Sequence, residues 1–95
     1  MHLATRTELY ARQDVRLSLW ELPPDSAIGF HRHEVRYCVV PVTGGTLTVV
    51  DGDGNETLRD TTTGAPYVGP AGTAHDVQNR SSELITFLEC EFLER

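Results

Sequence analysis

Turn-forming residues interrupt this 95-residue chain at intervals that leave room for short strands but not for long helices. The clearest turn is Asp51-Gly52-Asp53-Gly54-Asn55, whose Asp-Gly pairs are typical of β-hairpins. Thr43-Gly44-Gly45 and Gly69-Pro70-Ala71-Gly72 are further turns. Residues 15–20 alternate with a period of two, and no segment shows the roughly 3.6-residue period of a helix. This pattern predicts an all-β sandwich or barrel.

The expected strands follow from the runs between these turns. They cover residues 15–20, 28–33, 35–42, 46–50, 56–59, 74–78 and 84–93. Residues 5–13 are expected to hold one helical turn at most. The length predicts one domain, 1–95, with a core from about residue 15 to residue 93. A domain of this size buries only roughly 60–65% of its unfolded surface, so a bound metal or a second subunit would add stability.

Charge restricts the partners that this chain can bind. The net charge is −6 at pH 7 with a sequence pI near 5.0, and the chain has arginines but no lysine. Nucleic acid binding requires a basic stripe, and anionic membranes attract basic segments, so we expect neither partner. A small molecule is the expected ligand.

The cellular compartment is predicted from cysteines and from the absence of targeting signals. Cys38 and Cys90 lie in apolar, strand-like runs without a Cys-x-x-Cys motif, which indicates two reduced, partly buried thiols. The first residues contain no apolar leader, and no run is long enough to span a bilayer. We therefore expect a cytoplasmic protein.

Three of the four histidines form the most informative chemical pattern. His31 and His33 are two residues apart, a spacing that places both imidazoles on one face of a strand. His75 follows a turn that can bring it in from another strand. Three imidazoles converging in this way form a site for a divalent transition metal, with zinc, iron, nickel, copper and manganese all compatible.

The same residues resemble the two sequence motifs of the cupin superfamily. Gly64-x5-Pro70-x-Gly72-x2-His75-x3-Asn79 matches the second cupin motif at every position, and His31-x-His33 followed by Gly44 resembles the first. The resemblance covers residues 15–93 and implies the cupin double-stranded β-helix, an antiparallel jelly-roll barrel. It also implies that His31, His33 and His75 are metal ligands around an interior ligand site.

The chain departs from the first cupin motif at one position. The motif has a glutamate three or four residues after its second histidine, where this chain has Tyr37 and Cys38. Tyr37 has the strand parity of the histidines and should face the same interior. Glu34 should face away, and so should Cys38 unless a bulge in the strand turns it towards the metal. Tyr37 is thus the candidate catalytic residue. It could ligate the metal, act as an acid or base, contact a metal-bound water, or only pack.

Strand parity and composition also predict the positions of four other side chains. Phe30 and Trp20 are expected to pack in the barrel core. Glu89 and Glu91 are expected to face solvent, with an interaction of Glu89 behind the metal ligands as the alternative.

Three functions are compatible with these observations. The resemblance to cupins with three-histidine sites implies a metal-dependent enzyme acting on a small molecule, either a non-haem dioxygenase or a lyase, isomerase or hydrolase. The second function is a non-catalytic accessory or sensor protein that binds a small ligand or metal. The third is a metal-free structural cupin. An exposed edge strand would favour a homodimer in each case.

Overall fold

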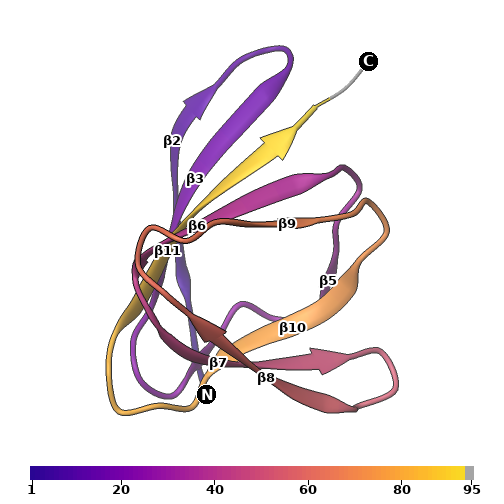
Figure 1. Ribbon diagram of the computed structural model, residues 1–95. Coiled ribbons are helices and arrows are strands. Elements are labelled where there is room, and N and C mark those ends of the chain that lie inside the picture. The colour runs from indigo at the N-terminus through magenta and orange to yellow at the C-terminus, as the bar shows by residue number, and fades with distance from the viewer. Residues whose placement is uncertain (94–95) are drawn as a thin grey trace.

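The computed structural model describes residues 1–93, which form β-strands and turns without a helix (Figure 1). The strands are β1 (His2–Leu3), β2 (Thr5–Ala11), β3 (Val15–Leu22), β4 (Ser26–Ala27), β5 (His31–Arg32), β6 (Tyr37–Thr43), β7 (Gly45–Asp51), β8 (Glu56–Thr61), β9 (Tyr67–Gly69), β10 (Ala74–Asn79) and β11 (Ile85–Phe92). Within residues 1–93, no helix is long and apolar enough to cross a membrane.

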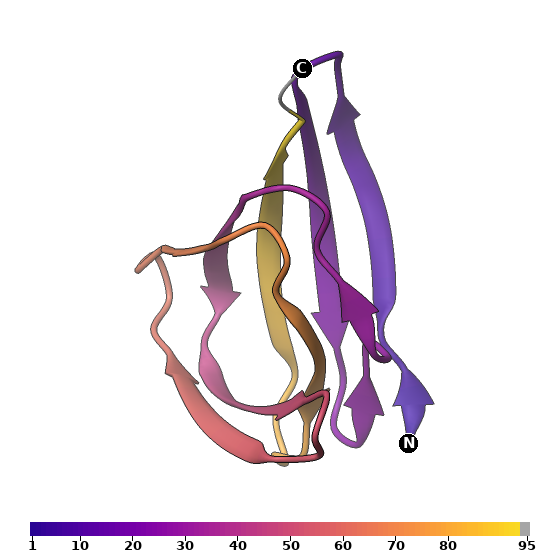
Figure 2. The ribbon, with the colours of Figure 1, turned by 90° about the vertical axis from the view of Figure 1, so that its right-hand side faces the viewer.

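The strands form two facing sheets that enclose the core. One sheet has the order β1-β4-β10-β7-β8, with β5 also paired to β10, and the other has the order β2-β3-β11-β6-β9. Every pairing is antiparallel except that of β1 with β4. Figure 2 shows the long strands of the second sheet beside the curved strands of the first. This arrangement confirms the all-β class that the turn spacing predicted and the jelly-roll barrel that the resemblance to cupins implies.

Side chains from both sheets meet between them because alternate residues of a strand point to opposite faces. The buried apolar core consists of Leu22, Tyr37, Val39, Leu47, Val77, Ile85 and Phe87. The interior is therefore apolar on most sides, and the polar groups described below are exceptions in it.

The helical turn expected within residues 5–13 is wrong. Residues of β2 instead pair antiparallel with β3, from Thr5 opposite Glu21 to Ala11 opposite Arg16. All seven residues of β2 are exposed, so the strand lacks the apolar alternation that would have identified it. Its conformation is set by hydrogen bonding to β3 rather than by local preference.

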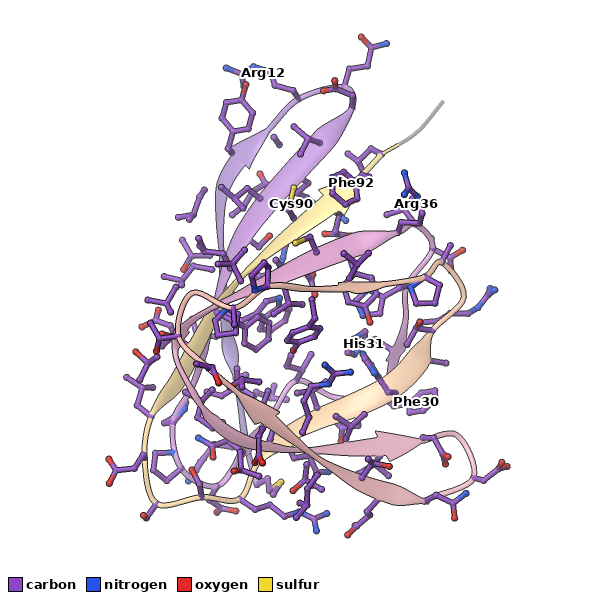
Figure 3. The ribbon with its side chains drawn as sticks, viewed as in Figure 1. Arg12, Phe30, His31, Arg36, Cys90 and Phe92 are labelled. Carbon is purple, nitrogen blue, oxygen red and sulfur yellow. The ribbon has the colours of Figure 1, made fainter. Side chains whose placement is uncertain are left out.

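The single strand expected over residues 28–33 is interrupted. Gly29 has a φ of 101°, a left-handed conformation that favours glycine, and separates β4 from β5. Phe30 follows this bend and is 60% exposed, pointing away from the barrel (Figure 3), so the expectation of a core position was wrong. Trp20 does pack against the core cluster. The short strand β9 also escaped prediction because glycine and proline precede it.

The expectation that Glu89 and Glu91 face solvent is wrong for both residues. Glu89 is buried, with 8% of its surface exposed, and lies opposite Ser18 of β3 and Val39 of β6. Glu91 lies opposite Arg16 and accepts two hydrogen bonds from its guanidinium, at 2.8 and 2.9 Å. The two glutamates share the inward-facing parity of β11 with Phe87. The apolar residues between them, such as Leu88, lie on the other face of the sheet, which is the reverse of the predicted orientation.

Candidate metal centre

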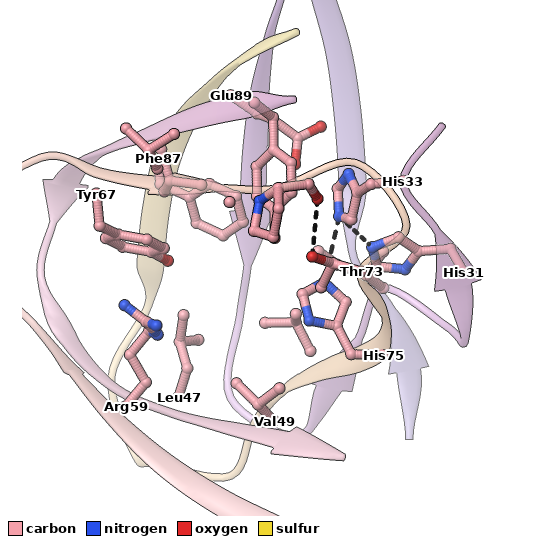
Figure 4. A pocket seen from close by; sticks show the side chains of 17 residues that line it. His31, His33, Leu47, Val49, Arg59, Tyr67, Thr73, His75, Phe87 and Glu89 are labelled. Atoms are coloured by element: carbon pink, nitrogen blue, oxygen red, sulfur yellow. Dashed lines mark hydrogen bonds between the residues drawn. The ribbon is translucent and has the colours of Figure 1, made fainter. Parts of the chain in front are cut away.

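Strand pairing brings the three histidines together. His31 on β5 lies directly opposite His75 on β10, and His33 follows β5 by one residue. The Nε2 atom of His33 is 3.0 Å from that of His31 and 3.2 Å from that of His75. One ligand atom from each ring lies within 4.8 Å of the others, and Figure 4 shows the three rings converging.

Backbone hydrogen bonds join the two sequence motifs at this point. The His33 N–H donates to the carbonyl of Thr73 at 2.8 Å, and the Gly72 N–H donates to the carbonyl of His33 at 2.7 Å. Gly72 adopts a φ of 91°, which the turn requires and which glycine allows at little cost. The glycine in the second motif therefore positions the histidine of the first.

The ring of His31 is oriented by a further hydrogen bond. Its Nδ1 is 2.8 Å from the carbonyl oxygen of Gly29, and a carbonyl can only accept a hydrogen bond. Nδ1 therefore carries the proton, and the lone pair of Nε2 is directed at the other two histidines. A hydrogen bond of this kind fixes the tautomer of metal-binding histidines.

Burial favours the neutral form of two of the three histidines. Burial, with a smaller contribution from His31, lowers the pKa of His33 to about 4. Burial also lowers the pKa of His75 to about 4, with smaller contributions from His31 and His33. Both rings are consequently neutral at pH 7, the protonation state that binds a metal.

Two of the three nitrogen spacings fit a single ion. Three imidazole nitrogens at about 2.1 Å from one ion are roughly 3.0 Å apart at right angles and roughly 3.4 Å apart in a tetrahedron. The His33–His31 and His33–His75 spacings of 3.0 and 3.2 Å lie within this range, and the third spacing is within 4.8 Å. The site is therefore capable of holding a divalent metal, with protein ligands on one side and open positions on the other.

The open side of the cluster faces a cavity of about 180 Å³ in the barrel. Apolar residues provide most of the wall, and they are Ile28, Val39, Leu47, Val49, Val68, Val77 and Phe87. Tyr37, Arg59, Tyr67, Thr73 and Glu89 supply polar groups in addition to the three histidines. A small site with apolar walls and a few polar groups is suited to binding one small molecule.

Tyr37 faces this cavity, as its parity predicts. Its ring stacks on that of His33, with centroids 3.8 Å apart and planes inclined by 17°. The Tyr37 hydroxyl is hydrogen-bonded to Thr73, and burial raises the pKa of the phenol above its usual value. Gly69 lies opposite Tyr37 on β9, and a Cβ atom there would overlap the phenol ring. The tyrosine is therefore held in one position beside the cluster.

Two other residues near the first motif lie outside the histidine cluster. Cys38 is a free thiol opposite Cys90 on the neighbouring strand β11, as expected for two reduced cysteines. Glu34 is exposed and lies 3.9 Å from Arg32. Among residues 1–93, the three histidines form the cluster suited to a metal, and neither residue joins it.

Arg59 was not assigned to the site from sequence, and Glu89 was connected with it only as an alternative to a solvent-facing position. Burial raises the pKa of Glu89, Glu91 adds to this effect, and the Trp20 indole lowers it slightly without forming a hydrogen bond of normal geometry. Glu89 also borders a second cavity of about 400 Å³, whose wall includes His31, His33 and Arg6. Buried carboxylates and inward-facing arginines are exceptions to the usual pattern, and such exceptions often mark functional sites.

Comparison with known proteins identifies relatives of this chain. The curated beta-alanine degradation protein BauB of Pseudomonas aeruginosa is 35% identical over 78 residues, which cover 82% of this chain and 81% of that protein. The crystal structure of a cupin domain from Bordetella pertussis matches with a TM-score of 0.91 and 33% identity, over 96% of this chain and 94% of that one.

More distant structures share the fold alone. An RmlC-like cupin family protein with a double-stranded β-helix from Methanocaldococcus jannaschii has a TM-score of 0.78 at 16% identity, over 94% of this chain and 79% of that one. No protein-family profile matches the sequence.

The fold and the site define a class of protein: a jelly-roll barrel whose interior has a three-histidine cluster capable of binding a metal. Together with the relatives above, they show that the chain belongs to the cupin superfamily.

Proposed function

We propose that this protein is a metal-dependent enzyme that transforms a small molecule in the barrel cavity. The observation that carries the proposal is the position of the three histidines, whose ligand nitrogens lie within 4.8 Å of one another at the wall of a cavity that Tyr37 also lines. His31, His33 and His75 would hold one divalent ion. The chemistry that such an ion supplies is Lewis-acid activation or, for iron, redox chemistry with dioxygen, as in non-haem dioxygenases.

The residues of the chain would bind the substrate and control its protons. The apolar walls exclude water, which strengthens polar interactions inside the cavity. Tyr37 is the candidate catalytic residue. Its hydroxyl, fixed by Thr73, can hold a proton or donate a hydrogen bond to a substrate oxygen beside the histidines. Because its pKa is raised, the phenol remains protonated at pH 7, which favours a role as a proton donor over a role as a ligand.

The curated relative supports a role in catabolism. That protein is named for the degradation of beta-alanine, a small amino acid, and the cavity of this chain is of a size for small molecules. We infer that this chain acts in the cytoplasm in the degradation of a small molecule, as an enzyme or as an accessory protein. The net charge of −6 supports a small-molecule partner rather than nucleic acid or an anionic membrane.

The second candidate is a non-catalytic protein that binds a ligand or metal. It is favoured by the tight packing of Tyr37 between His33 and Gly69, which suits a structural role as well as a chemical one. Enzyme and sensor differ in turnover: a sensor binds metal and ligand without consuming either oxygen or the ligand.

Elemental analysis of untagged protein tests the metal site directly. We expect about one transition metal per chain in wild type and in His2→Ala, because His2 lies on the exposed strand β1 outside the cluster. The double variant His31→Ala/His75→Ala should lose the metal. Tyr37→Phe should retain it if the phenol is not a ligand. If wild type stays metal-free after incubation with each candidate ion, the proposed metal site is wrong.

We also propose that two copies associate through the edge strand β2. All seven of its residues are exposed, and they include the hydrophobic side chains of Leu9 and Tyr10, which are 50% and 46% exposed. An edge strand has backbone groups free to pair with another strand, and pairing with a second copy satisfies them.

A further inference from the structure

Arg59 is an exposed residue of β8 whose side chain nevertheless lines the cavity of the barrel. It lies on β8 directly opposite Leu47 of β7, a core residue with 1% of its surface exposed, so both side chains are on the inner face of the sheet. Its neighbour Leu58 points outward and is 71% exposed. An arginine on the inner face and a leucine on the outer face reverse the usual pattern.

The Arg59 guanidinium has an aromatic partner but no acidic one. Its central carbon lies 4.1 Å from the centroid of the Tyr67 ring on β9. Within residues 1–93, Arg59 forms no ion pair with a carboxylate. Glu89, the other charged residue of the cavity, comes from β11 in the opposite sheet. Stacking on Tyr67 orients the guanidinium and leaves its N–H groups for a ligand.

Arg59 and the histidine cluster line the same cavity. Figure 4 shows the guanidinium on the far side of the cavity from His31, with apolar side chains between them. The cavity of about 180 Å³ has roughly the liquid volume of six water molecules, so one short molecule can span it. A bound divalent ion and Arg59 would both make the cavity attractive to an anion.

We propose that Arg59, held against Tyr67, binds the carboxylate of a small anionic substrate whose opposite end reaches the three-histidine centre. This assignment rests on the proposed function above and adds to it the chemical class of the substrate. A guanidinium presents two parallel N–H groups that match the two oxygens of one carboxylate. The apolar walls would surround the short carbon chain between the carboxylate and the reacting end.

Calorimetric titration with butyrate tests the assignment. Butyramide has the same shape without the charge, and Arg59→Gln removes the guanidinium. Arg12→Gln is the matched control, because Arg12 also stacks on a tyrosine, Tyr10 at 4.4 Å, but at the tip of the β2–β3 hairpin (Figure 3). Each protein is titrated both metal-free and with one equivalent of zinc, and its bound zinc and thermal unfolding are measured.

Wild type and Arg12→Gln should bind butyrate at least about tenfold more tightly than butyramide, since charged hydrogen bonds contribute on this scale. Arg59→Gln should weaken butyrate binding at least about tenfold, with and without zinc, while its zinc content and unfolding temperature stay those of wild type. Equal butyrate affinity in wild type and Arg59→Gln, or no butyrate binding by wild type, overturns the assignment. If wild type does not bind zinc, the proposed metal site is wrong instead. The zinc content measured on the same samples shows this independently of butyrate binding.

Discussion

At the scale of single residues, the position of Tyr37 depends on the absence of a side chain at Gly69. The phenol ring occupies the space that a Cβ atom would need, and on its other face it stacks on His33. The position of the His33 ring therefore depends on Tyr37, which is not one of the three clustered histidines. A substitution at Gly69 on β9 should consequently change the geometry of the histidine cluster, although β9 contributes no histidine.

We predict that Gly69→Ala destabilises the protein by about 1–3 kcal/mol, the usual cost of overpacking, because the tyrosine ring must move. Urea denaturation of four proteins measures this: wild type, Gly69→Ala, Tyr37→Leu and the double variant. In the Tyr37→Leu background the alanine should cost less than half as much, since the ring it opposes is gone. Equal costs in both backgrounds would mean that Gly69 serves another purpose.

At the scale of secondary structure elements, β11 connects the site to the rest of the second sheet. It lies between β3 and β6 and presents Phe87 and Glu89 to the cavity and Glu91 to Arg16. The hydrogen bonds from Arg16 lower the pKa of Glu91, whereas burial raises the pKa of Glu89. The pKa values of two carboxylates of equal strand parity are therefore shifted in opposite directions, that of Glu91 by Arg16 and that of Glu89 by burial.

Glu91→Gln should lower the free energy of unfolding by about 1 kcal/mol at pH 7, a value reduced for the partial exposure of Arg16. The pKa of Glu91 is lower in the folded protein than the usual glutamate value of 4.5, so its contribution to stability is fully present above that pH. The difference between wild type and variant should shrink as the pH falls below it. Urea denaturation from pH 3 to pH 7 measures this, and a difference independent of pH would exclude the ion pair as its cause.

At the scale of the whole molecule, the barrel leaves the strand β2 at the edge of its second sheet. β2 pairs with β3 on one side only, and every one of its residues is exposed. β8 is an edge strand of the other sheet, and its Leu58 is even more exposed than Leu9 of β2. The two exposed leucines allow the contribution of each edge to association to be compared.

Sedimentation equilibrium should report a dimer for wild type and for Leu58→Glu, and a shift towards monomer for Leu9→Glu. A charge on β2 would disfavour pairing with a second copy, whereas the same charge on β8 lies away from the proposed interface. The dimer proposal fails if wild type sediments as a monomer at all concentrations, or if Leu58→Glu dissociates the dimer while Leu9→Glu does not.

Much of the fold followed from local patterns. Turns such as Asp51-Gly52-Asp53-Gly54-Asn55 were identified correctly because their backbone requirements are local. β2 was missed because an exposed edge strand has no apolar face to produce alternation. Glu89 was misplaced because β11 has apolar residues on both faces, so composition could not show which face turns inward.

The sequence by itself determined the all-β class, the order of turns and strands, and the three histidines as a set, because strand periodicity and turn chemistry depend on near neighbours. Only the tertiary structure decided what surrounds that set. The hydrogen bond from His33 to Thr73, the packing of Tyr37 against Gly69 and the position of Arg59 opposite Leu47 all result from contacts between distant segments. Such contacts depend on register between distant segments, and a one-residue shift in register would reverse the face of every side chain.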